Sequence, residues 1–207
     1  MKSSLNDLIA QGEGVRLEFK SSISTAARIA RTLAAFANTA GGTLLIGIGD
    51  DGRVTGVESE YREMQKIEKA TDFHVDPALL VSYEKLAVEG KHILVIEVAE
   101  STDKPHYAID EQGNRTIYVR SRDKSVPTSK LILSPALTDT QLLQSPMVRT
   151  LLQFLRKNDT ITAAKLAQLV NISDSRANKL LRQLAEQGLL LMIDRPRPVR
   201  YSLKVSE

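Results

Sequence analysis

The residues best suited to chemistry lie near the C-terminus, on one side of a helix that the sequence predicts. Apolar residues between positions 177 and 184 recur at helical spacing. The polar residues on the opposite side are Ser175, Arg176, Asn178, Lys179 and Arg182. Arginine and asparagine can form paired hydrogen bonds with base edges, and lysine and arginine neutralise phosphates. This pattern therefore predicts a surface that reads nucleic acid.

A second basic segment follows this helix. Alternating residues at 189–193 and 199–203 flank the sequence DRPRP, which predicts a β-hairpin, or wing. The wing would present Arg195, Arg197 and Arg200, and its two prolines would stiffen a loop that lies along a groove. Residues 145–207 carry a net charge of +6, whereas residues 1–144 carry −3. The basic segment favours a polyanionic partner, and the alternative is a basic surface with no partner.

Three helices are expected to position these side chains. Ser145-Pro146 fits an N-cap followed by proline at the first helical position. A short second helix is expected to begin at Thr160 or Thr162, and a third to begin after the turn 171–173 and run to about 187. The segment ITAAKLAQLVNISDSRANKLLRQLAEQGLL resembles the winged helix-turn-helix of many bacterial regulators. The resemblance implies DNA binding, with a winged helix used only for protein contacts as the alternative.

The N-terminal part predicts a mixture of helices and strands, so the expected fold class is α+β. Strands are expected at 15–20, with one face exposed to solvent, at the apolar run 43–49, at 53–57 and at 116–120, and a β-hairpin is expected over 79–98. Helices are expected at 24–39 and 59–71, and Gly41-Gly42 is expected to end the first of them. Residues 1–133 are predicted to form one domain and residues 146–207 a second. Residues 134–145 are predicted to form the linker.

Two motifs in the N-terminal part point to a known family. GEGVRLEFK, residues 12–20, is followed by AAFANTAGGTLLIGIGDDGRVTGV, residues 34–57, and the pair resembles the Schlafen-type, divergent AlbA domain. PHYAIDEQGNRTIYVRSRDKSV, residues 105–126, resembles the distal strand of that domain. The phosphate contacts predicted in this domain are Lys20, Arg28, Arg31, Arg120, Arg122 and Lys124. For each of them the alternative is a solvated surface charge.

The resemblance also raises a catalytic alternative, because some Schlafens are ribonucleases with three carboxylates. The first two would map to Glu13 and Glu18, and the third to Asp50 or Asp51. Clustered carboxylates can hold Mg²⁺ or Mn²⁺, which activates water. A straight strand would place Glu13 and Glu18 on opposite faces, whereas a bulge at Gly14 would bring them together. The alternative is structural: Glu18 would pair with Arg16 or Lys20 on a solvent-exposed face, and Asp50 and Asp51 would only form a turn.

The composition excludes several kinds of site. The chain has no cysteine, so it has no disulfide, thiolate zinc site or cysteine nucleophile, and its three histidines are too scattered to replace a zinc site. No metal ligand set is assigned. The nine aromatic residues include no Trp, which disfavours a base-stacking platform. No phosphate-binding P-loop motif is present, so nucleotide sensing would rest on the glycine-rich segment after residue 46 alone.

The leading prediction is a cytoplasmic DNA-binding protein that regulates transcription, with RNA as the alternative nucleic acid. No apolar stretch is long enough for a membrane span, and the first residues lack the apolar core of a signal peptide. Animal nuclease cores of this family have two lobes, whereas this chain has one such domain. A homodimer, the commonest oligomer, is therefore expected. A metal-dependent ribonuclease and a nucleotide-sensing regulator are the rival functions.

Overall fold

The computed structural model describes residues 4–128 and 145–204. The chain divides into two compact units, Met1–Ser125 and Val126–Glu207. The predicted linker, apart from Ser145, lies outside the described residues. Within the described ranges, no helix is both long and apolar enough to cross a membrane.

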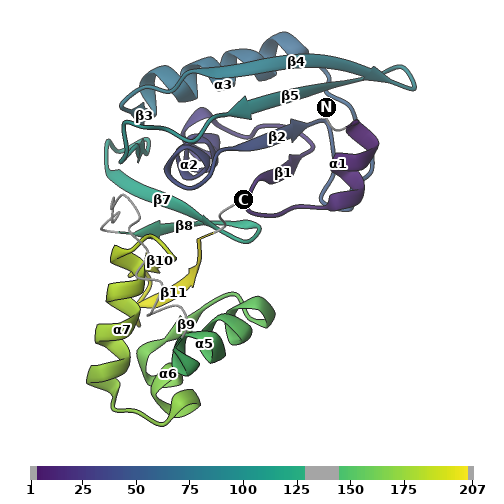
Figure 1. Ribbon diagram of the computed structural model, residues 1–207. Helices are drawn as coiled ribbons and strands as arrows, with labels where there is room; N and C mark the ends of the chain where they lie inside the picture. The colour runs from purple at the N-terminus through teal and green to yellow at the C-terminus, as the bar shows by residue number, and fades with distance from the viewer. Residues whose placement is uncertain (1–3, 129–144, 205–207) are drawn as a thin grey trace. The chain divides into compact units, whose positions relative to one another are not determined.

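The first unit is built around helix α2 (Ala26–Asn38), which lies between two four-stranded sheets (Figure 1). Thr25 caps the helix by accepting a hydrogen bond from the Arg28 backbone N–H at 3.2 Å. Eleven of the 13 residues are buried, and most of those are alanine. Small side chains are required here because both sides of the helix face packed sheets.

The first sheet has the order β1-β2-β5-β4. Strand β1 (Leu17–Lys20) is parallel to β2 (Gly42–Ile46), and β5 (Lys91–Val98) and β4 (Val81–Val88) follow antiparallel, as the predicted hairpin. One face packs against α2 and α3 (Glu60–Phe73), and the other against α1 (Leu5–Gln11). Alternation in β2 sends apolar side chains to both faces, which explains its continuous apolar run.

The second sheet contains β3 (Val75–Asp76), β6 (Tyr107–Ile109), β7 (Arg115–Ser121) and β8 (Lys124–Thr128). Asn38, at the end of α2, holds this sheet in place. Its Nδ2 donates to the carbonyls of His106 at 2.8 Å and Tyr118 at 2.9 Å, and its Oδ1 accepts from the His106 N–H at 2.8 Å. Asn38 therefore links the end of α2 to this sheet.

The predicted Gly41-Gly42 reversal is confirmed, and each glycine has its own reason. Gly41 has a φ of +69°, a conformation that side chains disfavour. A Cβ on Gly42 would lie 2.4 Å from two atoms of the Phe36 ring. The second glycine is therefore required by packing between α2 and β2.

In the first unit the structure differs from the sequence predictions at several places. Residues 53–57 form no strand beyond an isolated bridge between Ile48 and Val54, because Thr55 and Gly56 both donate to the Gly47 carbonyl. Helix α1 was not predicted, although its Ser4–Asp7 capping box is a readable signal. The prediction that one face of the strand at 15–20 is exposed to solvent is wrong for Glu18, which is buried.

The second unit contains helices α5 (Pro146–Lys157), α6 (Ala163–Val170) and α7 (Asp174–Glu186) and a small sheet. The sheet has the order β10 (Leu190–Ile193), β11 (Arg200–Leu203) and β9 (Ile161–Thr162). The predicted cap Ser145 is confirmed, Thr162 and not Thr160 caps α6, and Ser173 of the predicted turn caps α7. Strand β9 was not predicted because two residues carry no periodicity.

Candidate nucleic-acid interface

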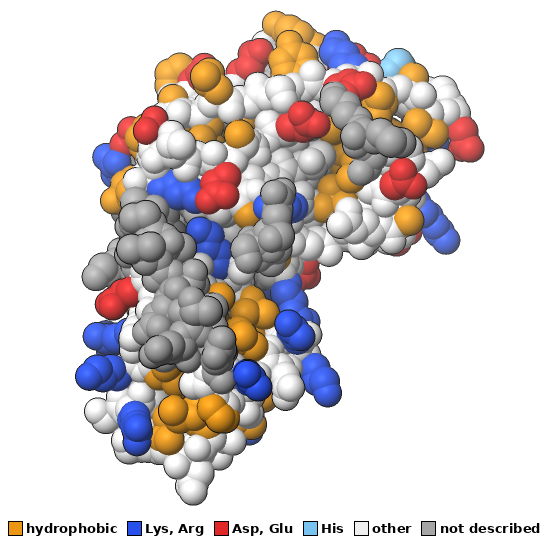
Figure 2. Space-filling view, viewed as in Figure 1, with side chains coloured by type: hydrophobic (Ala, Val, Ile, Leu, Met, Phe, Trp, Pro, Cys, Tyr) orange, Lys and Arg blue, Asp and Glu red, His pale blue; other side chains and the backbone are white. Residues whose placement is uncertain are grey.

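The buried side of α7 fixes which side chains it presents to solvent. Ala177, Leu181 and Leu184 are fully buried in the core of the second unit. On the other side, Ser175, Arg176, Lys179 and Arg182 are exposed and Asn178 is half-buried. Figure 2 shows Lys and Arg side chains along the edge of this unit where α7 lies in Figure 1. The structure therefore brings all five predicted α7 residues onto one helix, none of them fully buried.

The start of α7 is fixed by the turn between α6 and α7. Asn171 adopts the left-handed conformation with a φ of +53°, which ends α6. The Ser173 hydroxyl then accepts a hydrogen bond from the Arg176 backbone N–H at 3.3 Å, which begins α7. The predicted turn at 171–173 is confirmed, and it sets the direction in which the basic helix leaves the turn.

A shallow groove follows the exposed side of α7. Its lining residues are Ser175, Asn178, Lys179, Arg182, Gln183 and Glu186. Gln183 and Glu186 were not singled out in the sequence, although each lies four residues after a predicted contact, Lys179 or Arg182. Gln183 adds a side chain that can read bases, and Glu186 adds a negative charge at the far end of the groove.

The wing residues are not equivalent. Arg195 and Arg197 are exposed in the loop between β10 and β11, where the sequence predicted the wing tip. Arg200 is half-buried within β11, opposite Thr162 of β9 and Ile193 of β10. The two tip residues are therefore the better placed to reach a phosphate backbone, and Arg200 has a structural position in the sheet.

Tyr201 connects the wing to the recognition side of α7. It is 1% exposed within the core of the second unit. Burial raises the pKa of the Tyr201 phenol above its ordinary value, and the positive charge of Arg182 acts in the opposite direction. The charge of Arg182 on α7 therefore acts on the buried phenol of β11, whose oxygen has no hydrogen-bond partner among the described residues.

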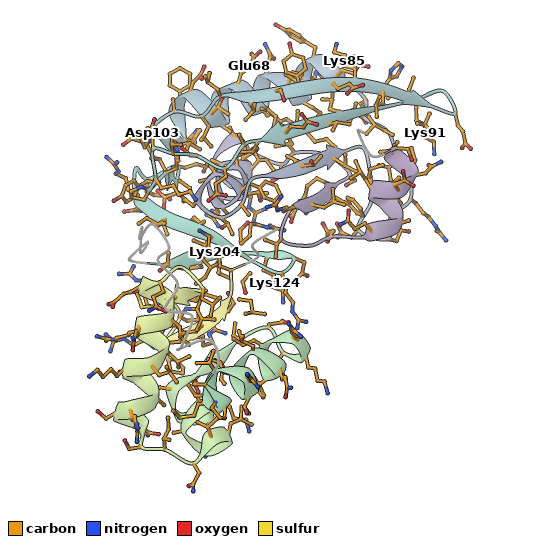
Figure 3. All side chains as sticks on the ribbon, viewed as in Figure 1. Glu68, Lys85, Lys91, Asp103, Lys124 and Lys204 are labelled. Atoms are coloured by element: carbon orange, nitrogen blue, oxygen red, sulfur yellow. The ribbon has the colours of Figure 1, made fainter. Side chains whose placement is uncertain are left out.

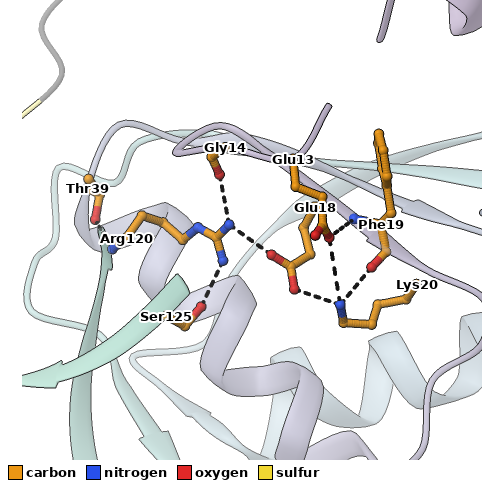
Figure 4. A network of polar contacts seen from close by, with 8 residues as sticks. All are labelled: Glu13, Gly14, Glu18, Phe19, Lys20, Thr39, Arg120 and Ser125. Carbon is orange, nitrogen blue, oxygen red and sulfur yellow. Dashed lines mark hydrogen bonds and ion pairs between the residues drawn. The ribbon is translucent and has the colours of Figure 1, made fainter. Parts of the chain in front are cut away.

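In the first unit, a turn brings Glu13 and Glu18 to the same lysine (Figure 4). The Gly14 N–H donates to the Leu17 carbonyl at 2.8 Å, so the chain folds back before β1. Glu13 Oε1 then accepts from the Phe19 N–H at 2.8 Å and lies 3.9 Å from Lys20 Nζ. Lys20 Nζ also lies 2.8 Å from Glu18 Oε1. A tight turn, and not a strand bulge, removes the separation expected for a straight strand.

Arg120 completes this network from β7, and its side chain is fully buried. Its Nη2 lies 2.8 Å from Glu18 Oε2 in an ion pair and donates a hydrogen bond to the Gly14 carbonyl at 2.8 Å. Its Nη1 donates to Ser125 Oγ at 3.0 Å. Its guanidinium also lies 4.8 Å from the centre of the Phe36 ring. Arg120 was predicted to contact phosphate, but the structure places it inside the unit as the partner of Glu18.

The other predicted carboxylates lie apart from this network of contacts. Asp51 Oδ1 accepts from the Arg53 N–H at 3.0 Å and Asp50 is exposed in the same turn. Among residues 4–128 and 145–204, no group of three or more Asp, Glu or His is arranged to hold a metal ion. Glu13 and Glu18 are already engaged by Lys20, Arg120 and a backbone N–H. These carboxylates do not form a ready cage for Mg²⁺ or Mn²⁺, and their catalytic role stays a prediction.

The remaining predicted phosphate contacts are accessible. Arg122 and Lys124 are exposed at the turn between β7 and β8, and Lys124 is marked in Figure 3. Lys20 has a side chain that is 37% exposed, although its ammonium group is paired with Glu18. Arg28 and Arg31 are also exposed, so Arg120 alone of the six predicted phosphate contacts of this unit is buried.

Comparison with known proteins agrees with this architecture. Residues 13–129 match the family described as Schlafen, AlbA_2. The chain belongs to this family. Residues 146–190 match the winged helix-turn-helix DNA-binding family, so the Schlafen, AlbA_2 domain is followed by a DNA-binding module. The fold prediction and the family resemblance are both confirmed, and the second unit is a DNA-binding domain.

Two solved structures are similar to a little more than half of the chain. The N-terminal domain of a RecG-related protein from Nitrosomonas europaea is 27% identical, with a TM-score of 0.43, over 53% of this chain and 82% of that one. The DIP2311 protein from Corynebacterium diphtheriae is 22% identical, with a TM-score of 0.42, over 60% of this chain and 30% of that one. No curated protein matches the chain.

Proposed function

We propose that this protein is a transcriptional regulator that reads duplex DNA with α7 in the major groove and with its wing along the backbone. The observation that carries the proposal is the exposure of Arg176, Lys179 and Arg182 on a helix whose other side is fully buried. A rigid helix with basic and amide side chains at its first turns has the form of a recognition helix. Arg195 and Arg197 supply two further charges for phosphates.

We further propose that the protein acts as a homodimer, because two modules reading paired half-sites multiply specificity. The surface proposed for the second copy is the outer edge of β4 together with α3. Within the described residues, β4 is the terminal strand of its sheet and runs for 8 residues. A long unpaired edge is a template for pairing with another strand.

Apolar side chains accompany this edge. Four of the five large exposed apolar residues of the described chain lie on α3, on β4 or directly before β4; they are Tyr61, Phe73, Leu80 and Tyr83. Figure 2 shows apolar side chains over these elements, and Figure 3 marks Glu68 and Lys85 on the same side. Together the four expose on the order of 500 Å², most of the roughly 800 Å² that each partner buries in a stable dimer. This area favours a second copy as the occupant.

DNA binding by α7 is tested with the full chain on a labelled duplex pool by fluorescence anisotropy. The Arg176→Ala plus Lys179→Ala variant is expected to weaken binding by about tenfold or more, because it loses one base contact and one phosphate contact. The matched control is Arg156→Ala plus Lys157→Ala, which removes the same charge from exposed residues at the end of α5. The control is expected to stay close to the unchanged protein.

Two results would overturn the assignment. Equal loss in both variants would mean that net charge, and not the α7 surface, governs binding. An unchanged affinity in the α7 variant would mean that the second unit binds DNA with another surface. Selection of bound sequences from the same pool then tests regulation, because a regulator enriches one operator sequence whereas a non-specific binder enriches none.

A further inference from the structure

A cavity in the first unit lies where β1 leads into α2. Its lining residues are Lys20, Ser22, Ile23, Ser24, Arg28, Ile29, Arg31 and Thr32. Ile23 and Ile29 are buried and form an apolar floor, whereas both serines and both arginines are exposed around it. Three basic side chains therefore surround one small space, in a part of the chain whose net charge is negative.

Within the described residues the two arginines of this cavity form no salt bridge, although hydrogen bonds from Asn114 and, to a smaller extent, the charge of Arg31 lower the pKa of Asp110. Lys20, by contrast, is paired with Glu18. The Arg31 guanidinium lies 5.8 Å from the centre of the Tyr118 ring, which restricts its direction. Arg28 and Arg31 are three residues apart on α2, so their charges repel each other. An anion in the cavity would remove that repulsion.

The loop that carries the two serines is held in place from α3. Glu63 Oε2 accepts from the Ile23 N–H at 2.7 Å, and Lys66 Nζ donates to the Ile23 carbonyl at 2.6 Å. Glu63 and Lys66 also pair with each other at 2.7 Å. Both polar groups of the Ile23 backbone are thus fixed by buried or half-buried partners. The cavity is therefore formed before any ligand arrives, which lowers the entropic cost of binding.

We infer that this cavity binds a phosphate group. The guanidinium groups of Arg28 and Arg31 can each donate two parallel hydrogen bonds to phosphate oxygens. The hydroxyls of Ser22 and Ser24 can donate to the same group, and the start of α2 places its partial positive charge beside it. A nucleic-acid strand would supply the phosphate as a diester, and a free nucleotide would supply it as a monoester. A nucleic-acid strand as the source of the phosphate rests on the proposed DNA-binding function. The cavity itself lies in the first unit, whereas the proposed recognition helix α7 lies in the second.

The test uses the full chain carrying Arg28→Gln and Arg31→Gln. The control carries Arg53→Gln and Lys69→Gln, which changes the net charge by the same amount at exposed positions outside the cavity. Binding of single-stranded and duplex oligonucleotides is measured at 50 and 200 mM salt, in the unchanged protein and in the Arg176→Ala plus Lys179→Ala background. Amide NMR shifts on titration with inorganic phosphate and adenosine monophosphate report on the free ligands.

The expected result is a weaker salt dependence in the Gln variant only. Loss of two phosphate contacts makes the fall in affinity between 50 and 200 mM salt smaller by about sevenfold for single strands and about tenfold for duplex. If only the free ligands shift the amides of 22–32, and the Gln variant abolishes those shifts, a free nucleotide is the source. The inference is overturned if no phosphate ligand distinguishes the Gln variant from its control. The comparison is repeated in the variant that lacks the α7 contacts. The cavity can therefore be tested even if DNA recognition by α7 proves wrong.

Discussion

Replacing Arg120 with Met separates the two roles that this residue could have. The sequence predicted that Arg120 contacts phosphate, whereas the structure buries Arg120 as the partner of Glu18. Met has a similar length and no charge, so Arg120→Met removes the ion pair while it fills most of the space. The predicted consequence is a loss of stability in the first unit, with no loss of DNA affinity.

The size of the loss follows from the contacts. The substitution deletes the 2.8 Å ion pair to Glu18 and the hydrogen bonds to the Gly14 carbonyl and Ser125 Oγ. It leaves a carboxylate whose side chain is only 10% exposed, with Lys20 as its one remaining cation in the described residues. Removing one member of a buried pair costs about 3–5 kcal/mol. Domains have roughly 5–15 kcal/mol of stability in total, so the variant should fold but unfold much earlier in urea.

Urea unfolding followed by circular dichroism measures the free energy, and hydrogen exchange by mass spectrometry locates the change. Exchange should accelerate in β1 and β7, which the pair connects, and stay unchanged in α5 to α7. The double variant Glu18→Gln plus Arg120→Met should lose less than the sum of the two single variants, by about 1–3 kcal/mol. That coupling arises because the second substitution removes the uncompensated charge.

Two outcomes would refute the reasoning. Additive losses would show that Glu18 and Arg120 do not depend on each other. Unchanged stability together with a weakened salt dependence of nucleic-acid binding would show that Arg120 reaches a phosphate, as the sequence alone suggested.

Three further predictions follow from single contacts. Gly42→Ala should cost about 1–3 kcal/mol in urea unfolding, because the new methyl would overlap the Phe36 ring, and a wild-type midpoint would contradict this. Burial raises the folded-state pKa of Tyr201 above 10.0, so the free energy of unfolding should fall as the pH rises above about 10. The Tyr201→Phe variant should show a smaller fall, and identical pH profiles of the two proteins would reject this prediction. Tyr83→Lys should weaken self-association at least about tenfold by analytical ultracentrifugation, because it charges an apolar edge, whereas Leu169→Lys should not; a monomeric unchanged protein would end the dimer proposal.

The sequence by itself determined the features that depend on neighbouring residues. Ser145 was predicted as a helix cap, and Thr162 was one of two residues predicted to begin the second helix, because a cap needs only a side-chain oxygen and the next turn of backbone. The basic side of α7 was predictable because apolar residues at helical spacing fix where the polar ones must lie. The two motifs of the first unit were also enough to identify its family.

Only the tertiary structure decided which charges are buried and which meet. Glu18 alternates with apolar neighbours as a surface residue would, yet it is 7% exposed because β7 brings Arg120 against it. Arg28 and Arg31 were predicted as phosphate contacts one by one, but only the structure places both in one cavity, beside the loop after β1 that α3 holds in place. The physical reason is that periodicity records the side of one element, whereas burial and pairing depend on elements from distant parts of the chain packing together.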